Sequence, residues 1–244
     1  KIVNNIFKNI VITGVGGAIG QAFVNRIATI DSVEKINVFS RSKQNFHSKK
    51  VFDHVINYKI EDEIKEAADF SSKNNSLDLV IVTNGILHDN NIFPEKKISD
   101  ITEEKFKEVF FINTILPSII AKHFIPKLSK NNQSILAFMS ARVGSISDNK
   151  LGGWYAYRAS KSALNMMIKN LSIEVGRKNK NAILVGLHPG TVNSKLSKPF
   201  QSNVPEKKLF TPDQSVSYLL QVLSKLKNED SGKIFAWDGS EILP

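Results

Sequence analysis

Near its N-terminus the chain reads Ile10-Val11-Ile12-Thr13-Gly14-Val15-Gly16-Gly17-Ala18-Ile19-Gly20. The apolar run is typical of a buried strand, expected over Ile6–Thr13, and a helical pattern follows the glycines. Between a strand and a helix, glycines let the backbone approach a pyrophosphate, and the N–H groups at the helix start favour an anion. The turn therefore predicts a dinucleotide-binding site made by Gly14, Gly16, Gly17, Ala18, Ile19 and Gly20.

Strand-like and helix-like segments alternate from this turn to the C-terminus. Further strands are expected over Lys35–Phe39, Val51–Asn57, Leu77–Val82, Ser134–Met139, Ala182–Leu187 and Gly232–Trp237. Helices are expected over Asp62–Ala68, from Ser99 to about Lys127, over Gly153–Arg177, and from Thr211 onward. This alternation predicts an α/β fold with a Rossmann-like, doubly wound parallel sheet of about seven strands.

One domain is expected over residues 1–244, because the chain shows no linker and no internal repeat. Only about ten residues, Arg41–Lys50, separate the second and third strands, so the crossover helix there is expected to be very short or absent. Residues 195–210 are polar and carry Pro199 and Pro205, and they are expected to form a mobile flap over the substrate.

Composition excludes several classes of site. The formal net charge is +10, but the lysines are spread along the chain without a dense basic block, so nucleic-acid binding is not expected. The chain has no cysteine, which excludes disulfides and thiolate metal sites, and its five histidines show no metal-ligand spacing, so no metal is expected. With no apolar run of about 18 residues and a polar start at Lys1–Lys8, a cytoplasmic protein without membrane contact is expected.

The end of the second strand predicts which nicotinamide cofactor is preferred. The strand is followed by Ser40, Arg41 and Ser42, with no acidic residue. An acid at this place would bond a free ribose 2′-hydroxyl, whereas an arginine accommodates a 2′-phosphate. NADP(H) is therefore favoured over NAD(H), and the alternative is that Arg41 is simply an exposed loop residue.

The second chemical signal is Trp154-Tyr155-Ala156-Tyr157-Arg158-Ala159-Ser160-Lys161 at the start of a long helical pattern. Residues four apart lie on the same face of a helix, so Tyr157 and Lys161 point the same way. A nearby ammonium favours the phenolate and is expected to lower the pKa of Tyr157, which could then exchange a proton with a substrate oxygen. Tyr155 lacks such a partner, because Ala159 stands four residues after it.

Taken together, these motifs resemble the single-domain short-chain dehydrogenase/reductase family over essentially the whole chain. The motifs that carry the resemblance are Thr13-Gly14 to Gly20, Gly85, Asn113, Ser140, Tyr157-x-x-x-Lys161 and Pro189-Gly190, in that order. Within the family, Ala141–Ile146 and Tyr155–Asn165 resemble the C-factor and sniffer-like carbonyl reductase group.

The resemblance implies an NADP-dependent interconversion of a small-molecule carbonyl and alcohol by a homodimer or homotetramer. Tyr157 would be the general acid or base, Lys161 would lower its pKa and bond the nicotinamide ribose, and Asn113 would hold a relay water. A serine after the fifth strand would orient the substrate oxygen. Besides the glycine turn and the Ser40–Ser42 pocket, the cofactor contacts would include Asn57, Asn84, Gly85, Tyr157, Lys161, Pro189, Gly190, Val192 and Ser194.

The chain departs from the family pattern at several positions. Ala18 replaces a usual glycine, and Gly14, Gly17 and Gly20 also fit the spacing of an extended, epimerase-like branch. Val82-Thr83-Asn84-Gly85 replaces Asn-Asn-Ala-Gly, so an asparagine that normally steadies the sheet is missing.

A further departure concerns the catalytic serine. A Ser-x-x-Gly pattern ending at Gly144 places Ala141 where that serine is expected. The hydroxyl would come from Ser140, alternatively from Ser145, or be absent with a low rate. These departures keep open an alternative function, an NADP-binding signalling or redox-sensing protein with vestigial turnover.

Overall fold

A seven-stranded parallel sheet forms the centre of the computed structural model, which describes residues 7–202 and 204–244. The strand order is β3-β2-β1-β4-β5-β6-β9. The strands span Asn9–Thr13 (β1), Lys35–Ser40 (β2), Val51–Val55 (β3), Leu79–Val82 (β4), Ser134–Met139 (β5), Ala182–His188 (β6) and Ile234–Ala236 (β9). The Rossmann-like doubly wound sheet expected from the sequence is confirmed. Ile6, at the start of the expected first strand, and Asn203, in the expected flap, lie outside the described residues.

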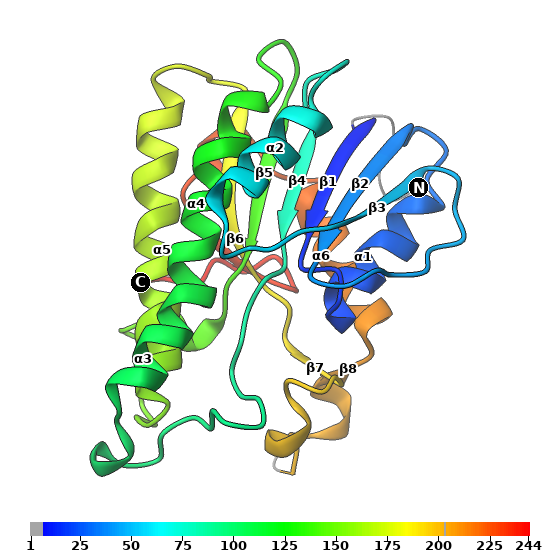
Figure 1. The fold of residues 1–244 in the computed structure, drawn as a ribbon. Coiled ribbons are helices and arrows are strands. Elements are labelled where there is room, and N and C mark those ends of the chain that lie inside the picture. The colour runs from blue at the N-terminus through cyan, green and yellow to red at the C-terminus, as the bar shows by residue number, and fades with distance from the viewer. Residues whose placement is uncertain (1–6, 203) are drawn as a thin grey trace.

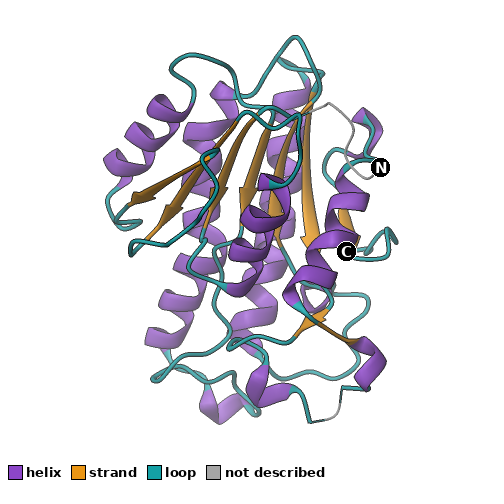
Figure 2. Cartoon of the chain, turned by 90° about the vertical axis from the view of Figure 1, so that its right-hand side faces the viewer, coloured by secondary structure: helices purple, strands orange, loops and turns teal. Residues whose placement is uncertain are grey.

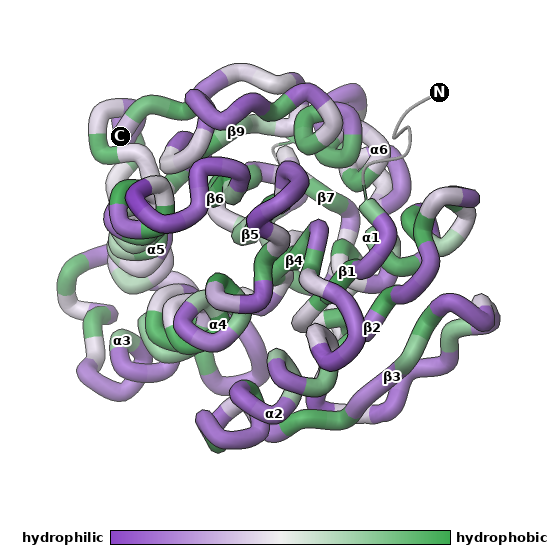
Figure 3. The backbone as a smooth tube through the Cα atoms, turned by 90° about the horizontal axis from the view of Figure 1, so that it is seen from above, coloured by the Kyte–Doolittle hydropathy of each residue, from purple (hydrophilic) through white to green (hydrophobic). Residues whose placement is uncertain are grey.

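Helices cover both faces of the sheet (Figures 1 and 2). On one face lie α1 (Ala18–Ala28) and α6 (Pro212–Leu223); on the other lie α2 (Glu61–Ser71), α4 (Leu116–Phe124) and α5 (Tyr155–Gly176). Side chains of consecutive strand residues alternate between the two layers, so Ile10 and Ile12 pack with α1 while Val11 packs with α4. The strands β1, β4, β5 and β6 are accordingly mostly apolar, whereas most of the outer loops are hydrophilic (Figure 3).

The strand order reverses at β1, which lies between β2 and β4. In open α/β sheets, ligands bind outside the carboxyl ends of the strands at this switch point. The Gly14–Gly20 turn follows β1 directly, and Thr83–Gly85 follows β4. Both segments therefore lie where a cofactor site is expected.

One long helical segment differs from the sequence expectation. The segment does not begin at Ser99, because Ser99 lies in a separate short 3₁₀ turn, η1 (Ile98–Asp100). The first helix of the segment is α3 (Glu103–Phe110). It begins after Thr102, whose hydroxyl accepts the Lys105 N–H at 3.4 Å. A π-helical turn, η2 (Phe111–Ile115), then joins α3 to α4, and η3 (Ile125–Lys127) ends the segment at the expected Lys127.

This segment, Glu103–Lys127, also corrects the expectation that no long apolar run exists. With a mean hydropathy of 1.4 in its most apolar window, it is long and apolar enough to cross a membrane by length and composition alone. Its apolar side chains are used inside the fold, however, because Leu116, Ile120 and Phe124 are buried in the core beneath the sheet. The segment is thus explained as a core helix.

Two connections lack a long helix. The first joins β2 to β3 and contains no helix, as the sequence predicted. The predicted flap, residues 195–210, contains the 3₁₀ turns η5 (Lys198–Phe200) and η6 (Glu206–Lys208), and β8 (Leu209–Phe210), which pairs with β7 (Thr191–Val192). Figure 1 shows this small unit beyond the carboxyl edge of the sheet.

Candidate active site

The inner side of the glycine turn is packed so closely that two positions admit only glycine. Gly14 has φ +77°, and a Cβ added there would lie 2.7 Å from the Asn84 backbone nitrogen. A Cβ on Gly20 would lie 2.8 Å from the Gly14 carbonyl oxygen. These contacts press the start of α1 against the ends of β1 and β4, as a dinucleotide-binding turn requires.

The outer side of the turn is open. Gly16 and Gly17 are exposed, and a Cβ on Gly16 would meet only the Gln44 side chain, at 3.8 Å. Helix α1 begins at Ala18, so the alanine that departs from the family pattern is accommodated as the first helical residue, with Ile19 after it. Open space above free N–H groups of a helix N-terminus fits a pyrophosphate.

Beneath the turn lies a tyrosine that the sequence did not indicate as functional. The buried Tyr58, just after β3, accepts the Gly14 N–H at 3.0 Å and donates its hydroxyl to the Phe39 carbonyl at 2.7 Å. Burial raises the pKa of Tyr58 to about 12, so the hydroxyl remains a donor at neutral pH.

Two threonines complete the link between the ends of β1 and β4. The Thr83 hydroxyl donates to the Thr13 carbonyl, and the Thr13 hydroxyl donates to Asn84 Oδ1, both at 2.6 Å. Together with Tyr58 these groups connect three strand ends. They hold the end of β4 at the place where the asparagine of the family pattern is absent.

Removing only the Tyr58 hydroxyl, in Tyr58→Phe, is expected to weaken cofactor binding about fivefold and to lower the free energy of unfolding by about 1 kcal/mol, one hydrogen bond's net worth. The Phe39 carbonyl would lose a donor and Gly14 one of its two acceptors. Fluorescence titration with NADPH and thermal unfolding measure the two effects. Tyr218→Phe is the matched control, because its hydroxyl bonds no residue in the described chain; equal cofactor affinity in both variants would contradict the role given to Tyr58.

The groups expected around the adenosine lie at the ends of β2 and β3. Arg41 and Ser42 are exposed, whereas Ser40 is buried and donates its hydroxyl to the Ser42 carbonyl at 2.6 Å, so Ser40 shapes the loop. Asn57 is exposed, and its side-chain oxygen accepts the Lys59 N–H. Arg41 therefore stands at the surface beside the glycine turn with its guanidinium available to an anion.

The structure brings Tyr157 and Lys161 together on α5. Lys161 is 3% exposed, and its ammonium lies 5.8 Å from the centre of the Tyr157 ring while donating to the Met139 carbonyl at 2.8 Å. The Tyr157 hydroxyl bonds to no other residue in the described chain, which leaves it free for a substrate oxygen. An atom on Gly85 at the Cβ position would lie 3.6 Å from the Lys161 ammonium, so the pair adjoins the end of β4.

The direction of the Tyr157 pKa corrects the sequence expectation. Burial raises the pKa of Tyr157 to about 12 and lowers the pKa of Lys161 to about 8. Desolvation disfavours the charged form of both groups and is the cause of both shifts. In the protein alone Tyr157 is therefore a protonated donor at neutral pH.

Asn113 is fully buried in the π-helical turn η2. Its side chain accepts the Ile86 N–H at 2.8 Å and donates to the Ile86 carbonyl at 2.9 Å and to the Ser160 hydroxyl at 3.1 Å. It thus joins the loop after β4 to α5 next to the Tyr157–Lys161 pair. Isolated π-helical turns are common at functional sites.

Neither candidate serine hydroxyl is directed at Tyr157. Ser140 is buried and donates to Asn165 Oδ1 at 2.6 Å, on the side of the sheet that faces α5. Ser145 lies 3.3 Å from the Ser147 hydroxyl and accepts the Asp148 N–H. Ala141, in extended backbone at the start of η4 (Arg142–Gly144), stands between them.

The turn after β6 lies against the flap. Gly190 has φ +75°, and a Cβ there would lie 2.7 Å from Phe210. The Pro189 carbonyl accepts the Ser215 hydroxyl, and the Val192 carbonyl accepts that of Ser197. The Ser194 N–H donates to the Ser197 hydroxyl at 3.4 Å. These residues lead directly from the end of β6 into the flap.

A sequence model of short chain dehydrogenases matches residues 8–205. The chain belongs to the short-chain dehydrogenase family. Membership confirms the family resemblance and makes the protein an NAD(P)-dependent oxidoreductase of the carbonyl/alcohol type.

Two related sequences illustrate the relationship. The C-signal of Myxococcus xanthus is 32% identical over 145 residues, covering 59% of this short-chain dehydrogenase and 82% of the relative. An oxidoreductase of Schizosaccharomyces pombe is 31% identical over 157 residues, covering 60% of this chain and 61% of the relative. The chain thus aligns with less than two thirds of the length of the yeast protein.

Two solved structures are similar over nearly the whole fold. The NADPH-bound carbonyl reductase from chicken fatty liver superimposes with a TM-score of 0.84 at 25% identity, covering 98% of this chain and 99% of the other. The carbonyl reductase Sniffer of D. melanogaster gives 0.83 at 21% identity, covering 98% and 100%. At 21% identity, the similarity to Sniffer is evidence for a shared fold only.

No group of three or more side chains suited to a metal ion occurs within residues 7–202 and 204–244.

The polar contacts that the sequence did not predict are those of Tyr58, of Ser160 with Asn113, and of Glu95 at the start of α5. These three contacts join residues far apart in the sequence, so no local spacing pattern could have indicated them.

Proposed function

We propose that this short-chain dehydrogenase reduces the carbonyl group of a small molecule with NADPH, or oxidises the corresponding alcohol. One observation carries the proposal: a tyrosine hydroxyl with no hydrogen-bond partner among the described residues lies one helical turn from a buried lysine, beside the end of β4. The open glycine turn follows the neighbouring strand β1. The similarity to an NADPH-bound carbonyl reductase supports the choice of cofactor.

In this proposal the nicotinamide supplies the hydride chemistry, and the chain binds, orients and moves a proton. Tyr157 would protonate the carbonyl oxygen as negative charge develops there, Lys161 would stabilise the Tyr157 oxygen and bond the ribose, and Asn113 would hold a relay water. Arg41 with Ser40 and Ser42 would take the 2′-phosphate. The remaining cofactor contacts would come from the glycine turn and from Asn57, Asn84, Gly85, Pro189, Gly190, Val192 and Ser194.

The substrate-orienting hydroxyl is proposed to be that of Ser140, with Ser145 as the alternative. Ser140 can serve only if its hydroxyl turns away from Asn165, and Ser145 only if it leaves Ser147. Unchanged turnover in the double variant Ser140→Ala/Ser145→Ala would contradict both assignments. It would mean that the enzyme works without this hydroxyl.

Arg41→Asp is expected to weaken NADPH binding about a hundredfold, because a charge-assisted bond worth up to about 3 kcal/mol is replaced by repulsion. NADH binding should be unchanged or improved, since a carboxylate can bond the 2′-hydroxyl. Titration of nicotinamide fluorescence with each cofactor measures both. Lys49→Asp is the control, because it changes the net charge equally at an exposed position before β3.

Each outcome of that titration has a consequence. A wild-type preference for NADPH that Arg41→Asp reverses would support the pocket. A preference for NADH would contradict the role of Arg41 and leave the oxidoreductase intact. Binding of neither cofactor would contradict the proposed function.

The hydrogen-bonded Ser140 and the alanine at position 141 favour a second candidate, an NADP-binding signalling or redox-sensing protein with vestigial turnover. Tight NADPH binding without turnover across a broad panel of aldehydes and ketones would select it. Turnover of any of them at an ordinary rate would exclude it.

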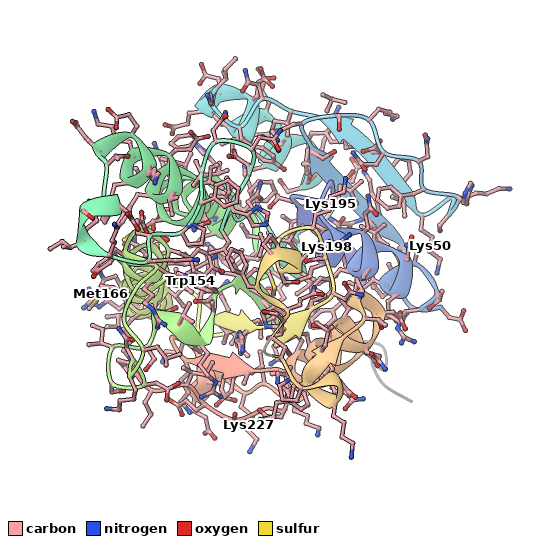
Figure 4. The ribbon with its side chains drawn as sticks, turned by 90° about the horizontal axis from the view of Figure 1, so that it is seen from below. Lys50, Trp154, Met166, Lys195, Lys198 and Lys227 are labelled. Carbon is pink, nitrogen blue, oxygen red and sulfur yellow. The ribbon has the colours of Figure 1, made fainter. Side chains whose placement is uncertain are left out.

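We also propose that the enzyme is a cytoplasmic homodimer or homotetramer. Exposed apolar side chains on η2 and α5, including Ile115 (48% exposed), Met166 (61%) and Ile173 (49%), would form the contact. Figure 4 shows Met166 at the outer edge of the molecule. A monomer in analytical ultracentrifugation would contradict the assembly.

A further inference from the structure

The N-terminus of α5 is held by a buried carboxylate from a distant segment. Glu95 is 2% exposed and lies in the loop between β4 and η1. Its Oε2 accepts the Ala156 N–H at 3.2 Å, and its backbone carbonyl accepts the Trp154 N–H at 2.6 Å. Helix α5 has no acidic residue in its first turn and no side-chain cap of its own, so Glu95 satisfies N–H groups that a local capping residue normally takes.

The backbone carbonyl of the same residue bonds a residue with an unusual backbone conformation. Trp154 has φ +50° and ψ +45°, and it is the one non-glycine residue with positive φ in the described part of the chain. It follows Gly152 and Gly153, both at φ +64°. A bulky residue in the left-handed region is disfavoured and persists only where its surroundings hold it. The bond from the Trp154 N–H to the Glu95 carbonyl is one of the contacts that hold it, together with the ring contacts of Trp154.

Trp154 lies between the catalytic tyrosine and the flap. Its ring meets the Tyr157 ring edge-on at 6.1 Å between centroids and the Phe200 ring at 5.0 Å. Phe200 also contacts His88, at 5.6 Å, and a ring nitrogen of His88 lies 3.0 Å from the Lys195 carbonyl. Figure 4 labels Trp154 on the same face as the flap residues Lys195 and Lys198. The loop that carries Glu95, the start of α5 and the flap therefore meet at one tryptophan.

We propose that Glu95 is a positioning residue for the reaction. Its carboxylate holds the first turn of α5 at Ala156, and its backbone carbonyl holds Trp154. Together these bonds fix the hydroxyl of Tyr157, the residue directly after Ala156, relative to the substrate carbonyl. Glu95 also keeps the Trp154 ring in contact with the Phe200 ring of the flap. The kinetic consequence rests on the proposed function, since displacement of a reacting group by about 1 Å can cost about a hundredfold in rate.

The test compares Glu95→Ala with Glu95→Gln, which keeps an oxygen acceptor for the Ala156 N–H. The control is Glu104→Ala, because Glu104 is an exposed glutamate on α3. Glu95→Ala is expected to lower kcat for carbonyl reduction about tenfold and to leave the NADPH dissociation constant within twofold. Glu95→Gln should restore most of the rate. If Glu95 only stabilised the fold, Glu95→Ala would lower the unfolding temperature but would not lower kcat while leaving NADPH binding unchanged.

A second readout does not depend on turnover. The chain has two tryptophans, so Trp237→Phe leaves Trp154 as the reporter, and each glutamate variant is compared within that background. Glu95→Ala is expected to shift the Trp154 emission to the red and to increase its quenching by acrylamide, and Glu104→Ala to do neither. In the wild-type protein, slow hydrogen exchange of the Ala156 N–H despite its place in the first helical turn is also expected.

Each outcome either supports or overturns the role given to Glu95. Unchanged kcat with unmoved emission in folded Glu95→Ala would overturn the proposal, as would a Glu95→Gln variant as impaired as Glu95→Ala. If Glu95→Ala does not fold, fast exchange of the Ala156 N–H in the wild type would overturn it. If the wild type reduces no carbonyl, the proposed function fails, while the emission and exchange measurements still test Glu95.

Discussion

Tyr157→Phe is expected to lower kcat for carbonyl reduction about a thousandfold and to leave NADPH binding within twofold of wild type. The pKa of Tyr157 stands at about 12, so at neutral pH the residue offers a proton, and phenylalanine offers none. Loss of a positioned general acid typically costs about 10²–10⁴-fold in rate. The ring contacts with Trp154 and Lys161 remain in the variant. Because the hydroxyl bonds to no described residue, thermal unfolding should be nearly unchanged.

Tyr155→Phe is the matched control for this experiment. Tyr155 is 37% exposed, lies on the same turn of α5 and has Ala159 four residues on, so its hydroxyl is expected to be dispensable. Single-turnover measurements with saturating NADPH separate the chemical step from cofactor binding. Retention of more than a tenth of wild-type kcat by Tyr157→Phe, or an equal loss in Tyr155→Phe, would show that Tyr157 is not the acid.

Features that depend on near neighbours in the chain were predictable from the sequence. Apolar runs gave the strands of the sheet, because a strand buried on both faces is apolar along its whole length. The spacing of Tyr157 and Lys161 placed them on one helical face. The glycine turn was recognisable from its place between β1 and α1. Even the absent crossover helix followed from the ten residues available between β2 and β3.

Features that depend on the packing of distant segments were not predictable. Tyr58 bonds Gly14 across 44 positions and Glu95 bonds Ala156 across 61, and neither contact leaves a local pattern. The pKa of Tyr157 was predicted in the wrong direction for the same reason. Charge proximity on a helix can be read from spacing, whereas desolvation is set by everything that packs around the pair. Likewise, only the bond from Ser140 to Asn165 shows which way that serine points.

Lys161→Met is expected to abolish measurable reduction and at the same time to raise the unfolding temperature at pH 7 by about 2 to 6 °C. Burial moves the pKa of Lys161 from 10.5 to about 8, and each pKa unit is worth about 1.4 kcal/mol, so the charged lysine costs the folded state about 3 kcal/mol. The lost bond to the Met139 carbonyl offsets about 1 kcal/mol of the gain. The net stabilisation of about 1–2 kcal/mol gives the stated shift for a chain of this length.

The pH dependence of this stability difference distinguishes a charge effect from better packing. Below pH 8 the lysine is charged in both folded and unfolded states, and its full cost is present. Between about pH 8 and 10.5 the unfolded chain binds more protons than the folded one, so the wild type gains stability as the pH rises. The advantage of Lys161→Met should therefore shrink from pH 7 toward pH 10. Lys169→Met, exposed on the same helix, should show neither effect. A stability gain that is constant over this range would mean that the buried charge is not its source.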